Sequence, residues 1–135
     1  MSEHKQENIT SVNDPEGLIA NLVTTYIAAS GSESFGPIDM RGFAGGMVKI
    51  PSAWTAADLA FKVCESEGGT YVALKDDDNN NLIKITNITT NASYWYPIPD
   101  QVFSAPYVKL FSVDTADESA EAQASARDIY VALKG

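Results

Sequence analysis

The sequence predicts an all-β domain, a β-sandwich or jelly roll of eight or nine short strands. Short runs of β-branched and aromatic residues recur about every ten residues, which is typical of strands. Clusters of Gly, Pro, Asn, Asp and Ser separate these runs and predict turns. The 135 residues suffice for one well-packed domain, whereas two separate cores would each be marginal.

Residues 22–29 are predicted to be the first strand of the domain. β-Branched and aromatic side chains dominate this run, which ends at Ser30. The alternative is an amphipathic helix over residues 18–29, because Leu18 and Leu22 repeat at helical spacing.

The remaining strands follow the same logic along the chain. Residues 47–50 and 59–64 alternate between apolar and polar side chains and stop before proline or glycine. Residues 70–74 and 82–85 flank the polar run 76–81, so we expect them to pair as a hairpin. The expected strands are 22–29, 35–43, 47–50, 59–64, 70–74, 82–85, 94–98, 107–111 and 128–133, with one helical turn at 99–104.

The N-terminal segment differs from the rest of the chain. Residues 1–16 are polar, charged and without periodicity, and they end in a turn at Asp14 and Pro15. Such a segment cannot bury enough apolar surface to offset its ordering entropy unless a neighbour covers it. We therefore expect a flexible or partner-ordered arm over residues 1–16 and a single β-sandwich domain over residues 17–135. The candidate partner contacts follow the arm: Leu18, Ile19, Leu22 and Tyr26.

The net charge of −9 limits the partner classes. No basic cluster occurs, so we expect neither nucleic acid nor a membrane as a partner. The start of the chain lacks the apolar core of a signal peptide, and Cys64 is the only cysteine, so we expect synthesis in a reducing cytoplasm. Cys64 lies in an alternating run and is expected to be a small buried side chain.

The sequence contains no constellation typical of catalysis. The only histidine, His4, lies in the expected arm, so no nucleophile–histidine set can form in a rigid core. Residues 76–81 begin like a calcium-binding loop, but Asn81 replaces the required glycine and Asn87 the required glutamate. We therefore expect no enzyme activity, no metal site and no cofactor.

Consecutive aromatic residues are the next candidate for function. Tyr94, Trp95 and Tyr96 would lie on a strand with Trp95 on one face and both tyrosines on the other. An exposed aromatic platform of these residues would stack on sugars, which indicates a carbohydrate-binding module. The competing interpretation is that one of the two faces packs in the core.

Residues 47–134 contain several short sequence segments in a characteristic order. The first is IPSAWTAADLAF at 50–61, followed by a hairpin with an acidic turn at 71–85 and an aromatic strand that contains proline. The segments YVKL at 107–110 and QASARDIYVALK at 123–134 complete the order. In this order the segments resemble small structural proteins of tailed-bacteriophage virions, of the capsid decoration or cement type.

The resemblance implies a compact β-sandwich that decorates and stabilises the capsid exterior of a virion without catalysis. The implied partners are the major capsid protein and further copies of the chain, in a homo-oligomer for which a trimer is favoured. The implied site of synthesis is the host cytoplasm. The alternative function is a carbohydrate-binding adsorption module associated with a phage tail or spike.

Overall fold

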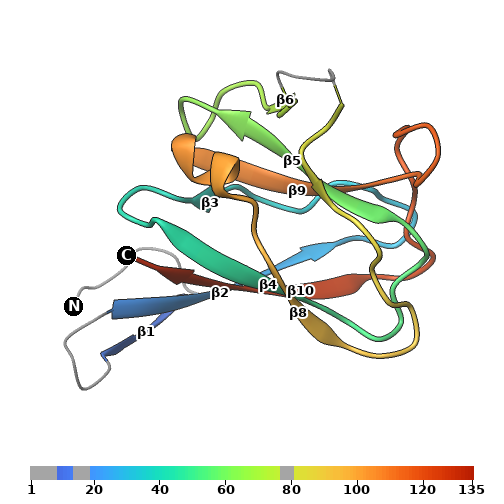
Figure 1. Ribbon diagram of the computed structural model, residues 1–135, viewed down its shortest axis with the longest axis horizontal. Helices are drawn as coiled ribbons and strands as arrows, with labels where there is room; N and C mark the ends of the chain where they lie inside the picture. The colour runs from blue at the N-terminus through green and yellow to red at the C-terminus, as the bar shows by residue number, and fades with distance from the viewer. Residues whose placement is uncertain (1–8, 14–18, 77–80) are drawn as a thin grey trace.

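The computed structural model describes residues 9–13, 19–76 and 81–135. Their strands form two antiparallel sheets stacked face to face, so the predicted β-sandwich is confirmed (Figure 1). The elements in chain order are β1 (Ile9–Asn13), β2 (Ile19–Ile27), β3 (Ile38–Asp39), β4 (Gly45–Ile50), β5 (Asp58–Cys64), β6 (Val72–Ala73), β7 (Lys84–Ile85), β8 (Tyr94–Pro97), the 3₁₀ turn η1 (Asp100–Ser104), β9 (Tyr107–Val113) and β10 (Arg127–Lys134).

The strand order is that of a jelly roll. Sheet A has the order β1-β2-β10-β4-β8, and sheet B has the order β3-β9-β5-β6, with β7 also paired to β5. The chain resembles a ribbon doubled back on itself, because β2 pairs with β10, β3 with β9, β4 with β8 and β5 with β7. Wrapping such a ribbon into two sheets gives the jelly-roll topology that the sequence predicts. The strand β1 is an addition at the edge of sheet A.

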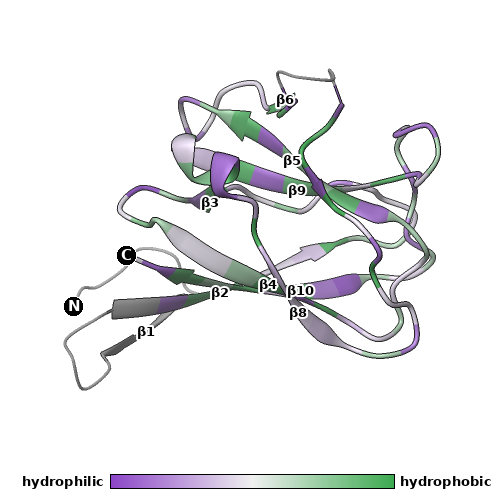
Figure 2. Ribbon diagram, viewed as in Figure 1, coloured by the Kyte–Doolittle hydropathy of each residue, from purple (hydrophilic) through white to green (hydrophobic). Residues whose placement is uncertain are grey.

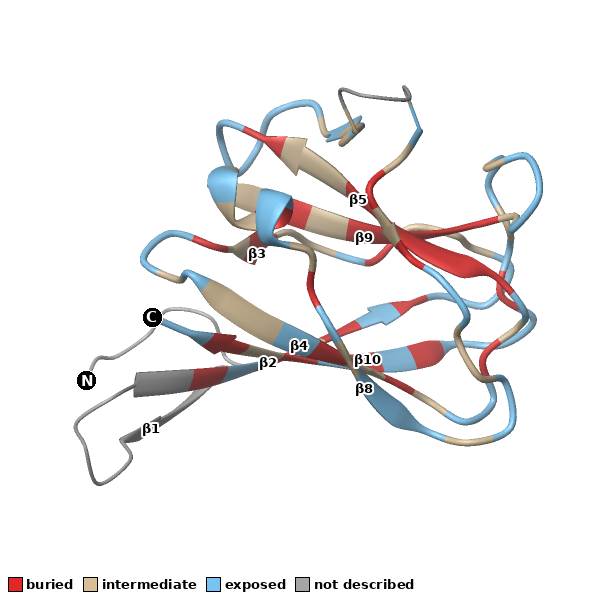
Figure 3. Cartoon of the chain, in the orientation of Figure 1, coloured by how far each residue is buried: buried red, intermediate tan, exposed pale blue. Residues whose placement is uncertain are grey.

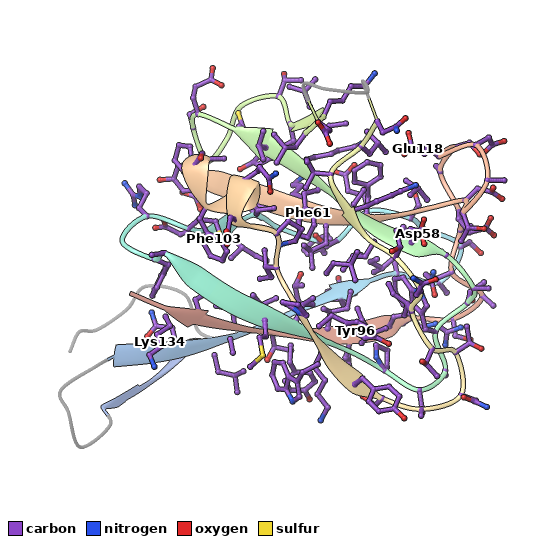
Figure 4. All side chains as sticks on the ribbon, in the orientation of Figure 1. Asp58, Phe61, Tyr96, Phe103, Glu118 and Lys134 are labelled. Atoms are coloured by element: carbon purple, nitrogen blue, oxygen red, sulfur yellow. The ribbon has the colours of Figure 1, made fainter. Side chains whose placement is uncertain are left out.

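The core lies between the sheets and follows from strand alternation. Figure 3 shows buried and exposed residues alternating along β10, where Ile129, Val131 and Leu133 are buried. Most of β5 and β9 is apolar (Figure 2), and Leu59, Phe61, Val108 and Leu110 from these strands are buried in the core. Phe61 of β5 is completely buried in the same core (Figure 4). Removal of these side chains from water is the main favourable contribution to folding.

The nine expected strands are all present, with small differences in their bounds. Residues 19–27 form a strand, so the helical alternative for this segment is wrong. The largest difference lies in 35–43, where only Ile38–Asp39 is a strand. Gly36 there has a φ of 80°, and Pro37 has no N–H to donate, so a longer ladder cannot form.

Part of the expected N-terminal arm is a strand of the sheet. Ile9–Asn13 pairs antiparallel with β2, in a register that runs from Ile9 opposite Val23 to Asn13 opposite Ile19. This segment is therefore held by its own chain, and the sandwich includes it. The rest of the expected arm, 1–8 and 14–16, lies outside the described residues.

The expected hairpin is also present. Lys75 pairs with Leu82, and the N–H of Asp76 donates to the carbonyl of Asn81 at 2.7 Å. Its strands β6 and β7 both pair with β5. Residues 77–80 of the calcium-like run lie outside the described residues.

A buried polar cluster joins the loop after β4 to the segment before β10. The completely buried Gln123 accepts at Oε1 from the Thr55 N–H at 2.9 Å and from Arg127 Nε at 3.0 Å. Arg127 Nη2 donates to Thr55 Oγ1 at 2.9 Å. Mutual hydrogen bonding offsets the cost of burying these polar groups. Segments 50–61 and 123–134, which are distant in the sequence, therefore meet at this cluster.

Candidate interaction surface

The outer face of sheet A, the side turned away from sheet B, carries two rows of side chains from four strands. The strand register aligns a first set, named here the Ala132 row: Leu22, Ala132, Met47 and Pro97. It aligns a second set, the Tyr130 row: Thr24, Tyr130, Lys49 and Trp95. Directly opposed residues of paired strands lie close enough for their side chains to touch, so each row is a continuous strip.

Large apolar side chains on this face are exposed. Met47 is 46% exposed, Trp95 42% and Tyr130 39%. Tyr26 and Phe35 extend the face, since their rings stack with centroids 5.3 Å apart and Phe35 is 72% exposed. Of the eight exposed large apolar side chains in the described residues, six lie on or beside this face. Contiguous exposed apolar surface of this kind marks an interaction site.

Two charged side chains lie at opposite ends of this face, and a third, Lys49, lies in the Tyr130 row. The central strand β10 turns outward, in order, Asp128, Tyr130, Ala132 and Lys134. Asp128 and Lys134 take no part in the five ion pairs of the described residues. Lys49 lies over the Tyr130 ring, 5.7 Å from its centroid, a cation–π contact. The face is therefore mainly apolar at its centre, with an acid and a base at opposite ends of β10.

The outer face of sheet B is different, because its charges are paired within the chain. Lys62 Nζ lies 2.7 Å from Glu33 Oε1, and Lys109 Nζ lies 3.5 Å from Glu33 Oε2. The two lysines also lie over the rings of Phe111 and Tyr71, at 5.0 and 4.9 Å. Burial alone would raise the pKa of Glu33, but hydrogen bonds and positive charge from both lysines outweigh it and lower the pKa.

The consecutive aromatic residues of β8 do not form one platform. Trp95 belongs to the Tyr130 row and faces outward, as strand alternation predicts. Tyr96 is half-buried against the core, and its hydroxyl oxygen accepts a hydrogen bond from the Thr89 N–H at 2.9 Å. Tyr94 lies two residues before Tyr96, so it is on the same side of β8, and it is 53% exposed. Trp95 therefore lies on the opposite face of β8 from its two sequence neighbours, in one row with Tyr130 and separated from it by Lys49.

Two of the four candidate partner contacts lie on the outer face of sheet A. Leu22 and Tyr26 are exposed there, because the alternation that buries Val23 and Ile27 turns them outward. Ile19 begins β2, and Leu18 lies outside the described residues.

Other members of the face are not among the residues that the sequence singles out. Tyr130 could have been found from alternation in 128–133, because Ile129 and Val131 occupy the inward positions. Its neighbours on the face could not be found that way, since Lys49 and Thr24 adjoin it only through the strand order.

A cluster of three charged side chains lies at the edge of sheet B. Lys84 Nζ lies 3.2 Å from Asp58 Oδ2 and 3.0 Å from Glu118 Oε2. Figure 4 shows Asp58 and Glu118 at the same end of the molecule. Burial alone would lower the pKa of Lys84, but hydrogen bonds and charge from the two carboxylates outweigh it and raise the pKa. Two open hollows of about 450 and 420 Å³ share Lys84 and Thr86 in their linings. The ammonium engages both carboxylates, so the cluster is a structural ion network.

Metal sites, membrane-spanning helices and the single cysteine are the other candidate functional features. In that part of the chain no group of three or more His, Cys, Asp or Glu side chains could hold a metal ion. No helix among residues 9–13, 19–76 and 81–135 is long and apolar enough to cross a membrane. Cys64 is buried, as expected, with its sulfur 3.7 Å from Glu65 Oε1.

The two outer faces of the sandwich are thus the features from which a function can be inferred. One is apolar and exposed, and the other has its charges paired. Comparison of the chain with protein-family models, with curated proteins and with solved structures finds no match.

Proposed function

We propose that the protein is a virion structural protein that decorates and stabilises a capsid shell without catalysis. In this proposal it binds the major capsid protein on the capsid exterior as a homo-oligomer. The observation that carries the proposal is the exposed apolar face of sheet A, with Met47, Trp95 and Tyr130, beside a sheet B whose charges are paired. This difference between two faces is typical of a subunit in an assembly, because a neighbouring protein covers one face and solvent contacts the other. The resemblance of residues 47–134 to capsid decoration proteins supports the same function.

Stabilisation would come from many equivalent contacts. A protein that binds only the assembled shell stabilises it by RT ln(1 + [L]/Kd), about 2.7 kcal/mol per site at a hundredfold excess over Kd. Summed over the shell, this modest contribution would resist outward pressure from packaged DNA. The net charge of −9 favours solubility of unbound copies.

The test is binding to purified, expanded capsid shells of a tailed phage. The protein should bind them saturably and raise their disruption temperature in calorimetry. Tyr130→Glu places a charge at the centre of the outer face of sheet A and should abolish both effects, because it breaks the homo-oligomer that binds the shell. Val72→Glu introduces the same charge at a residue of β6 that is 64% exposed, and should leave both effects unchanged. Failure of the unmodified protein to bind shells would refute the proposal.

One observation favours a carbohydrate-binding adsorption module as the second candidate. Trp95 and Tyr130 are both exposed in the same row, with Lys49 between them. Aromatic rings stack on sugars, and the ammonium can donate to sugar hydroxyls. Saturable binding to a host surface polysaccharide that Trp95→Ala abolishes, together with no shell binding, would replace the first proposal with this one.

A further inference from the structure

We propose that the outer face of sheet A binds a second copy of this chain in a twofold, antiparallel, face-to-face dimer. The dimer rests on the proposed function, in which a protein surface covers this face; that surface is the same face of a second copy. Dimerisation is measured without capsid shells, so its failure is distinguishable from a failure of shell binding.

The outward charges of β10 determine the relative direction of the two copies. Asp128 and Lys134 lie at opposite ends of the strand, with Tyr130 and Ala132 between them. When two copies face each other with their β10 strands antiparallel, Asp128 of each lies opposite Lys134 of the other. A parallel arrangement would instead place Asp128 against Asp128 and Lys134 against Lys134. Like charges opposed across an interface are destabilising, so the charges select the antiparallel dimer.

The same arrangement places the two aromatic side chains of the Tyr130 row opposite smaller ones. The twofold axis crosses β10 between Tyr130 and Ala132, so the Tyr130 row of one copy faces the Ala132 row of the other. Tyr130 then lies against Ala132 of the second copy, and Trp95 lies against Pro97. Facing large and small side chains can interdigitate at the density of a protein interior. Symmetry makes each of these contacts occur twice.

The charge balance of the face favours self-association although the whole chain is acidic. Only three charged side chains lie on the outer face of sheet A among the described side chains of β2, β4, β8 and β10. They are Lys49, Asp128 and Lys134. The face is therefore slightly basic on a chain of net charge −9. Two acidic copies that meet through it keep their remaining negative charges apart, which lowers their mutual repulsion.

Sedimentation velocity of the full chain over a concentration series tests the dimer. The expected mass at high concentration is twice the chain mass of 14.5 kDa. Asp128→Lys alone and Lys134→Asp alone each turn two attractive contacts into two repulsive ones, and each should raise the dimer Kd at least about tenfold. The double variant D128K/K134D restores opposite charges and should return Kd to within about threefold of the unmodified chain. Asp100→Lys and Lys75→Asp make the same charge changes at exposed residues elsewhere and should not weaken the dimer.

Melting temperatures distinguish a weakened dimer from a folding defect. The four substituted residues, Asp128, Lys134, Asp100 and Lys75, are exposed, so their variants should melt at the same temperature as the unmodified chain. If Asp128→Lys or Lys134→Asp unfolds the chain, Tyr130→Glu tests the same face independently. A monomer at every soluble concentration overturns the inference, and so does the trimer that the resemblance implies. A dimer that the single reversals leave intact, or that the double variant fails to restore, overturns the antiparallel arrangement.

Discussion

Replacement of Lys84 by methionine tests how strongly the ion network at the edge of sheet B stabilises the fold. The Asp58 side chain is only 5% exposed, and Lys84 contacts its carboxylate. Methionine keeps much of the apolar stem of lysine but removes the ammonium, so Asp58 is left buried beside Glu118 without this counter-charge. Breaking a buried ion pair costs about 3–5 kcal/mol, and the partial exposure of Glu118, 24%, leads us to expect the lower end, about 3 kcal/mol. Such a loss lowers the melting temperature by about 10 °C for a domain of this size.

Urea unfolding followed by fluorescence of the buried Trp54 measures this loss directly. The double variant D58N/K84M removes the stranded carboxylate as well, so it should lose less stability than K84M alone. Lys75→Met changes an exposed lysine of the hairpin and should stay within about 0.5 kcal/mol of the unmodified protein. If K84M also stays within about 0.5 kcal/mol, the network is screened by solvent and the reasoning is refuted.

Two further perturbations test the packing of sheet A and the charges of sheet B. Gly46→Ala should cost about 2 kcal/mol in urea unfolding, because its Cβ would come closer than 3.0 Å to the Ala132 carbonyl oxygen. Gly45→Ala is the matched control, since a Cβ there meets nothing within 4 Å; equal stability of the two variants would contradict the prediction. The lowered pKa of Glu33 contributes stability above its ordinary value of 4.5, and this stability is lost as pH falls through the folded pKa. The stability difference between the unmodified protein and Glu33→Gln should therefore be largest near neutral pH and shrink below pH 4.5; a constant difference down to pH 3 would argue against the pairing with Lys62.

The strands could be predicted because burial from one side imposes a period of two on the sequence. Ile129, Val131 and Leu133 show this period in β10, and the core confirms it. The short extent of β3 follows from backbone constraints at a glycine with positive φ and a proline. The strand β1 could not be predicted, because Ile9–Asn13 contains few apolar residues and is held by its ladder to β2.

The interaction surface was predictable only one strand at a time. Alternation explains why Leu22 and Tyr26 face outward, and why Trp95 and Tyr96 face opposite ways. The rows themselves depend on pairings between distant segments, such as Thr24 with Tyr130. Such pairings result from the wrapping of the whole chain, which local periodicity does not encode.

The doubled-back ribbon also has a consequence for how the chain acquires its structure during synthesis. Of the ten strands in the described residues, β10 is translated last, yet it occupies the centre of sheet A. Until residues 127–134 have been made, β2 and β4 have no strand between them, and sheet A can exist only as two separate hairpin-like halves. Strands that are distant in the sequence pair slowly during folding. Unpaired strand edges are prone to aggregate until the missing strand has paired with them. Truncation before residue 127 would therefore divide sheet A through its middle, whereas loss of β1 would remove only an edge.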